Sequence, residues 1–119
     1  MSSIRNNKDR VYYNREDLKQ ETVEGNVTRY IYTGKTLQTV EYHFPPNKMF
    51  PKHKHDEHEQ IGYLVKGKMG FKIGDEEKIL LPGDFYHAPI GVVHHGWTLD
   101  EPSVLIDIFS PIREDLVKE

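Results

Sequence analysis

From residue 27 onward, the sequence alternates short segments rich in β-branched and aromatic residues with turns that contain glycine or proline. Segments 27–32 and 39–44 show the partial period-two alternation of strands with one buried face. Segments that recur about every eight to twelve residues with such turns predict a β-sandwich or a barrel. The expected strands are 27–32, 39–44, 52–55, 60–65, 69–73, 78–81, 85–88, 94–99 and 104–109.

The two ends of the chain depart from this pattern. Residues 1–26 are polar and irregular, and we expect an N-terminal arm in which 11–13 could add an edge strand and 15–20 a short helical turn. Residues 27–119 then form one barrel domain, because 119 residues suffice for one core but not for two. Residues 113–118 look helical and predict a short C-terminal helix.

Charge and composition exclude several classes of partner. The net charge is -3 and the basic residues are scattered, so no basic stripe is available for nucleic acid. The first ten residues are polar and charged, so we expect neither a signal peptide nor a membrane partner. The chain has no cysteine, which excludes disulfides and thiolate metal sites and favours a cytoplasmic location.

Histidine is concentrated in two places. Five of the seven histidines fall in two clusters, at His53, His55 and His58 and at His94 and His95. On a strand, His53 and His55 project to the same side, so their imidazoles can converge on one ion. Gln60 could add a side-chain oxygen, and His94 would arrive from a distant strand. Ligands of this kind suit a divalent metal ion, with zinc, nickel, iron and manganese left open.

These residues carry a family resemblance. The spacing His53-x-His55-x4-Gln60-x6-Gly67 resembles the first cupin motif, and Gly83-x5-Pro89-x-Gly91-x2-His94 resembles the second. The resemblance implies an all-β fold, the double-stranded β-helix or jelly-roll cupin barrel. It also implies a metal in the mouth of the barrel and a homodimer.

The third ligand departs from the family pattern, which most often has glutamate where this chain has Gln60. Glu59 is the alternative, because the motif tolerates three or four residues after the second histidine. Counting back from Gly67 favours Gln60, and Glu59 would point to the opposite face. With Gln60 all ligands are neutral, so the ion keeps its positive charge and a Lewis-acid role is favoured.

Asp107 interrupts an otherwise apolar strand and shares a face with Leu105 and Phe109. A carboxylate buried beside an aromatic ring is costly unless it is paired or functional. The alternative is an outward-facing aspartate on an edge strand. If Asp107 faces the metal, it could act as a general acid or base, and Arg113 could bind a substrate carboxylate. The alternative for Arg113 is a surface arginine.

The tail Asp107-x-Phe109-Ser110-Pro111-x-Arg113-Glu114-Asp115, together with Gln60, is similar to the KdgF-type cupins, which linearise 4,5-unsaturated uronates. This resemblance implies a metal-dependent, isomerase- or lyase-like enzyme acting on a small, carboxylated sugar. An iron- or manganese-dependent dioxygenase and a non-catalytic metabolite-binding cupin are the alternatives. The implied roles are metal binding for His53, His55, Gln60 and His94, catalysis for Asp107, and substrate binding for Phe109 and Arg113.

Overall fold

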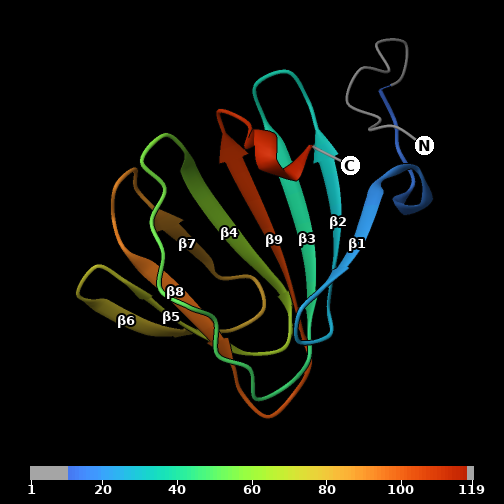
Figure 1. Ribbon diagram of the computed structural model, residues 1–119. Coiled ribbons are helices and arrows are strands. Elements are labelled where there is room, and N and C mark those ends of the chain that lie inside the picture. The colour runs from blue at the N-terminus through green and yellow to red at the C-terminus, as the bar shows by residue number, and fades with distance from the viewer. Residues whose placement is uncertain (1–10, 118–119) are drawn as a thin grey trace.

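The computed structural model describes residues 11–117, and almost all regular structure in this range is β (Figure 1). Two short 3-10 turns, η1 and η2, lie near the ends of the described range. The elements are η1 Arg15–Asp17, β1 Lys19–Val23, β2 Val27–Thr33, β3 Gln38–Phe44, β4 Glu59–Lys66, β5 Met69–Ile73, β6 Glu76–Leu80, β7 Phe85–Ala88, β8 His94–Thr98, β9 Ser103–Ser110 and η2 Glu114–Leu116.

The strands form two antiparallel sheets. The larger has the order β1-β2-β3-β9-β4-β7 and the smaller the order β6-β5-β8. In Figure 1 the two sheets face each other, and the main apolar cluster draws on both of them, with Leu64 and Leu105 from the larger and Met69 and Phe71 from the smaller. The burial of alternate residues on β9 follows directly from strand geometry. The predicted all-β jelly roll is confirmed.

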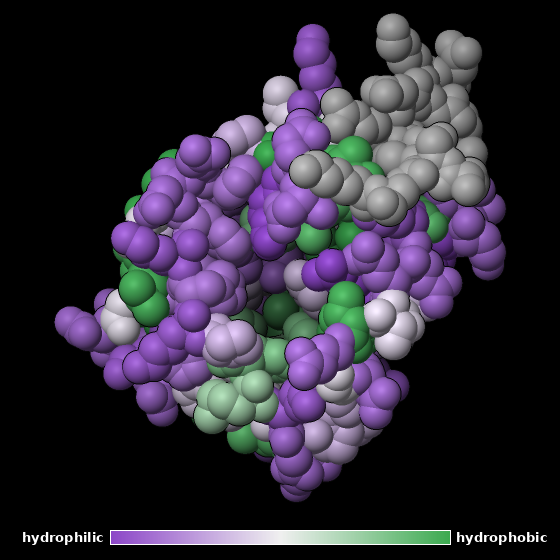
Figure 2. All heavy atoms as spheres, viewed as in Figure 1, coloured by the Kyte–Doolittle hydropathy of each residue, from purple (hydrophilic) through white to green (hydrophobic). Residues whose placement is uncertain are grey.

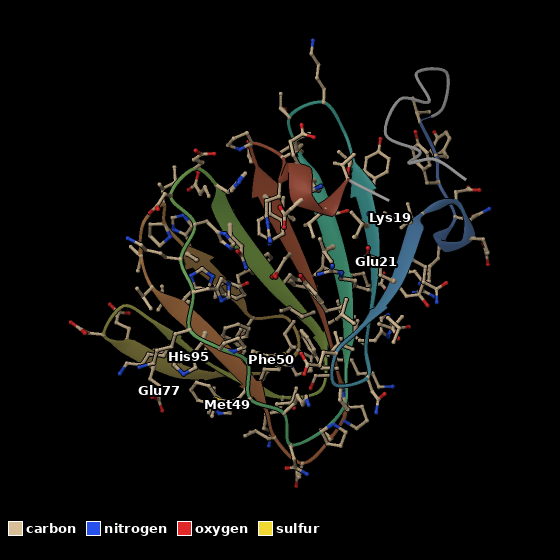
Figure 3. The ribbon with its side chains drawn as sticks, viewed as in Figure 1. Lys19, Glu21, Met49, Phe50, Glu77 and His95 are labelled. Atoms are coloured by element: carbon tan, nitrogen blue, oxygen red, sulfur yellow. The ribbon has the colours of Figure 1, made fainter. Side chains whose placement is uncertain are left out.

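The N-terminal edge strand lies later in the chain than expected. Residues 11–13 form no strand, whereas Lys19–Val23 pairs with β2 and extends the larger sheet. Glu21 lies directly opposite Arg29, with Glu21 Oε1 2.6 Å from Arg29 Nη2. Lys19, labelled with Glu21 in Figure 3, is 3.4 Å from the same carboxylate. Charge pairs of this kind between neighbouring strands stabilise β1. Because the strand depends on charged residues, its position could not be predicted from an apolar pattern. Residues 1–10 lie outside the described range.

The C-terminal helix is only one 3-10 turn, Glu114–Leu116. Leu116 in this turn is buried and packs in a small cluster with Ile31, Val40 and Phe109. Lys118, the end of the predicted helix, lies outside the described residues. In residues 11–117 no helix is long and apolar enough to cross a membrane.

The expected strand at 52–55 is also absent. Within this segment only His53 forms a bridge, with His94. The loop between β3 and β4 instead runs beside β8, where the backbone N–H groups of Phe50 and His53 donate to the carbonyls of Gly96 and His94. Phe50, labelled in Figure 3, packs against the main core cluster. This irregular segment carries His53 and His55 across the mouth of the barrel.

Candidate metal centre and adjoining cavity

Three histidines meet where the β3–β4 loop crosses the start of β8. The backbones of His53 and His94 exchange two hydrogen bonds, of 3.0 and 2.8 Å, which fix these residues side by side. The ring centroids lie 4.3 Å apart for His53 and His94, and 5.0 Å apart for His53 and His55. The candidate ligand nitrogens of His53, His55 and His94 all lie within 4.8 Å of one another. The structure therefore assembles a three-histidine cluster that could hold a metal.

Backbone carbonyls orient two of the three rings. Nδ1 of His53 lies 3.1 Å from the carbonyl of Pro51, and Nδ1 of His94 lies 3.1 Å from the carbonyl of Val92. A carbonyl oxygen only accepts, so each Nδ1 donates and each Nε2 keeps its lone pair. This is the arrangement by which histidine ligands are usually held toward a metal.

Burial keeps two of the imidazoles neutral. Burial, together with the charges of Arg113 and the neighbouring histidines, lowers the pKa of His55 to about 4. It also lowers the pKa of His94, although the hydrogen bond to the Val92 carbonyl acts in the opposite direction. Because only a neutral imidazole binds a metal, both rings are ready to act as ligands near pH 7.

Gln60 lies in the same cavity as His53 and His94, whereas Glu59 lies elsewhere. Gln60 is 4% exposed and lines the cavity. Glu59 is exposed, with Oε2 2.6 Å from Nε2 of His87. Gln60 and Glu59 therefore lie on opposite faces of β4, as strand alternation predicts.

The donor set fits a divalent cation. Among the described residues, three buried polar side-chain atoms have no hydrogen-bond partner: Nε2 of His55, Nε2 of His94 and Oε1 of Gln60. Oε1 of Gln60 can only accept, and Nε2 of His94 accepts because Nδ1 of that ring donates to a carbonyl. Buried polar atoms are almost always satisfied. A metal ion bound by nitrogen and oxygen would satisfy all of them.

A cavity of about 150 Å³ lies beside this cluster. Figure 2 shows a hollow in this face of the molecule, with hydrophobic side chains at its floor and hydrophilic residues around it. Much of the wall is aromatic or aliphatic, and the polar groups are few. The polar or charged lining residues are Tyr42, His53, Gln60, Tyr86, His94, Asp107 and Arg113.

Asp107 faces this cavity. β9 is paired on both sides, by β3 and β4, so the alternative of an outward-facing aspartate on an edge strand is wrong. The side chain is 5% exposed; Tyr86 Oη donates to Oδ1 at 2.7 Å, and Gln60 Nε2 donates to Oδ2 at 3.1 Å. Burial raises the pKa of Asp107 to about 7, while the Tyr86 hydrogen bond and the charge of Arg113 act to lower it. Such a carboxyl group can hold or release a proton near neutral pH.

Phe109 and Arg113 line the same cavity. The guanidinium carbon of Arg113 lies 5.1 Å from the centre of the Phe109 ring, and Nη2 pairs with Asp115 at 2.9 Å. The Arg113 side chain is 20% exposed, so the guanidinium lies between the cavity and the solvent. Three of the four expected metal ligands, His53, Gln60 and His94, therefore surround one space with the side chains expected to contact a substrate.

Sequence reasoning missed Tyr86, which is buried and contacts both Gln60 and Asp107. Its alternation with exposed Phe85 and His87 could have placed it on the inner face of β7. No local signal indicates that its hydroxyl reaches Asp107, which lies 21 positions further along the chain.

Comparison with known proteins gives this site a family context. A model of the cupin domain matches residues 40–109, a range that contains all four candidate metal ligands and Asp107. The pectin degradation protein KdgF of Dickeya dadantii (strain 3937) is 37% identical over 109 residues, which cover 91% of this chain and 99% of that protein.

Solved structures agree. KdgF from Halomonas sp. superposes with a TM-score of 0.82 at 31% identity, covering 89% of this chain and 97% of that one. An RmlC-like cupin from Shewanella frigidimarina NCIMB 400 gives a TM-score of 0.81 at 29% identity, with coverage of 89% and 95%. The fold, the domain match and the similarity to KdgF along nearly the whole chain agree, and the protein belongs to the cupin family.

Proposed function

We propose that the protein is a metal-dependent enzyme that opens and tautomerises a small carboxylated sugar, most concretely a 4,5-unsaturated uronate. The observation that carries this proposal is that Asp107 and Arg113 line the same cavity as His53, Gln60 and His94. The similarity to KdgF, named as a pectin degradation protein, supports a uronate as the substrate class.

The metal would be held by His53, His55, Gln60 and His94. Bound there, a divalent ion such as zinc, nickel, iron or manganese would supply Lewis-acid polarisation of substrate oxygens. The four neutral ligands leave its charge uncompensated, which supports this role over a redox role. A dioxygenase remains the alternative, and oxygen consumption that depends on reduced iron would favour it.

Arg113 and Phe109 are proposed to bind the substrate. The planar guanidinium matches a carboxylate through two parallel hydrogen bonds. In the structure Arg113 makes such a two-point contact with Asp115, at 2.9 and 3.3 Å, so the geometry is available to a substrate carboxylate that replaces it. The Phe109 ring beneath the guanidinium would pack against the apolar edge of the sugar ring.

Asp107 is proposed to move one proton. Its carboxylate removes the proton from the anomeric hydroxyl, the bond between C1 and the ring oxygen breaks, and an aldehyde forms at C1 while the ring oxygen stays on C5 as an enolate. Transfer of the proton from Asp107 to C4 converts the enolate to a ketone. The reaction is an isomerisation that needs no oxidant or reductant, and a carboxyl group with a pKa of about 7 suits both transfers.

The test is to incubate purified protein with 4,5-unsaturated galacturonate and to follow loss of the cyclic form by NMR. Asp107→Asn should lose most of the activity. Asp75→Asn, in the exposed turn between β5 and β6, is the matched control and should retain it. A wild-type rate no faster than buffer, or equal rates for wild type and Asp107→Asn, would overturn the proposal. Tight uronate binding without turnover would indicate a non-catalytic binding protein.

The homodimer expected from the family resemblance and the cytoplasmic location stay predictions. Ile61 and Phe85, which lie on the outer face of β4 and β7 and are 40% and 63% exposed, support a protein contact on that face. Light scattering of the purified protein would measure the mass in solution. A monomer at micromolar concentration would contradict the dimer.

A further inference from the structure

The amide of Gln60 is held at its nitrogen end only. Nε2 donates to Tyr86 Oη and to Asp107 Oδ2, whereas Oε1 is buried without a partner. A carboxylate oxygen accepts and never donates, so Asp107 selects the nitrogen of the amide. The carbonyl end is thereby turned away from Asp107 and left free for a cation.

The Tyr86 hydroxyl can contact Gln60 and Asp107 because Gly62 leaves room for the tyrosine ring. Gly62 lies on β4 between its two partners, opposite Tyr86 on β7 and opposite Asp107 on β9. A Cβ at position 62 would lie 1.9 Å from Cε2 of Tyr86. The ring therefore crosses the central strand over Gly62, and its hydroxyl donates to Asp107 Oδ1 at 2.7 Å.

We propose that Tyr86 and Asp107 are positioning residues that fix the Gln60 amide with its oxygen toward the histidines, and that they are the reason why position 60 carries glutamine. A glutamate here would place a second carboxylate oxygen at the Nε2 position, 3.1 Å from Asp107 Oδ2, where the two like charges repel unless they share a proton. The departure from the usual cupin ligand thus follows from the residue at position 107. This inference rests on the metal part of the proposed function and not on the uronate reaction.

The first test is a double-mutant cycle on thermal unfolding of the metal-free protein at pH 8. Asp107→Asn is made in the wild type and in Gln60→Glu, because the Asn amide can donate to a glutamate at position 60. We expect Asp107→Asn to raise Tm by several degrees more in the Gln60→Glu protein than in the wild type. Equal changes in the two backgrounds would overturn the proposal.

The second test is zinc affinity, measured by competition titration with the metal alone. Tyr86→Phe removes only the hydroxyl, and Gly62→Ala displaces the ring while keeping it. Each should weaken zinc binding on the order of ten-fold, as loss of a residue that orients a metal ligand usually does. Tyr63→Phe, on the outer face of β4, is the matched control and should bind zinc as the wild type does.

Zinc binding by Tyr86→Phe at wild-type affinity would overturn the proposal. If Gly62→Ala does not fold, Tyr86→Phe decides the matter alone. Neither test uses a uronate, so a protein that passes both tests and turns over no uronate would contradict only the proposed reaction. A wild-type protein that binds no metal would overturn the metal site and this inference together.

Discussion

Gln38 on β3 holds the main chain of Arg113 from both sides. Gln38 Oε1 accepts from the backbone N–H of Arg113 at 2.9 Å, and Gln38 Nε2 donates to the Arg113 carbonyl at 3.2 Å. Gln38 is completely buried, and Nε2 also donates to Thr33 Oγ1 at 3.0 Å. A side-chain amide therefore determines where the chain emerges after β9 and where the guanidinium of Arg113 lies.

Replacement of Gln38 should damage both stability and substrate binding. Gln38→Met keeps the volume but leaves the backbone N–H of Arg113 unpaired, at a cost of about 1–3 kcal/mol, while the Arg113 carbonyl still accepts from the N–H of Leu116. We expect a lower urea midpoint and a raised KM for the uronate. Gln20→Met, at an exposed position on β1, is the control and should change neither. An unchanged KM in the Gln38 variant would show that Arg113 does not need this support.

Arg113→Lys should separate binding from chemistry. Lysine keeps the charge but loses the two-point fork, so KM should rise on the order of ten-fold while kcat changes less. Steady-state kinetics on a charged uronate and on its neutral methyl ester would measure this. The wild type should prefer the charged substrate, and the variant should lose most of that preference. Equal preference in both proteins would contradict a carboxylate-binding role.

The stability of the metal-free protein should depend on the ionisation of Asp107. The pKa of Asp107 is about 7 in the folded protein, against an ordinary value of 3.8, so the folded state binds more protons between these values. Stability contributed by the protonated form is complete below about pH 4 and is lost as the pH rises to about 7, a loss of a few kcal/mol.

Urea unfolding of wild type and Asp107→Asn from pH 4 to 8 would measure this effect. The lowered pKa of His55 acts in the opposite direction, because its stabilising contribution is lost as the pH falls below 6.5. His55 contributes to the free energy of unfolding of both proteins, so its contribution cancels when one value is subtracted from the other. A difference that does not vary with pH would show that Asp107 is not perturbed.

Metal addition should stabilise the folded protein through the histidine cluster. A ligand that binds only the folded state at 100 times its Kd adds about 2.7 kcal/mol. We expect zinc to raise Tm, a chelator to reverse the rise, and His94→Ala to abolish it. His95→Ala is the matched control, because His95 is not part of the three-histidine cluster. Loss of the zinc effect in His95→Ala but not in His94→Ala would contradict the assigned site.

Much of the fold was predictable because its signals are local. Alternation and the proline and glycine turns located most of the strands from residue 27 onward, and the two histidine motifs located the cluster and the cavity beside it. Alternation also separated Gln60 from Glu59, because adjacent strand residues point to opposite faces. The prediction failed for β1, where the stabilising pairs join Glu21 to Lys19 and Arg29 and no apolar pattern is present.

What the sequence by itself determined was the set of strands, the histidine cluster and the side of each strand that faces inward. Only the tertiary structure decided which inward side chains touch. Tyr86 meets Asp107 across Gly62, and Gln38 holds Arg113 although 75 positions separate them. The physical reason is that a strand's period specifies a face, whereas a hydrogen bond between distant residues depends on register and on the space that a neighbouring residue leaves empty.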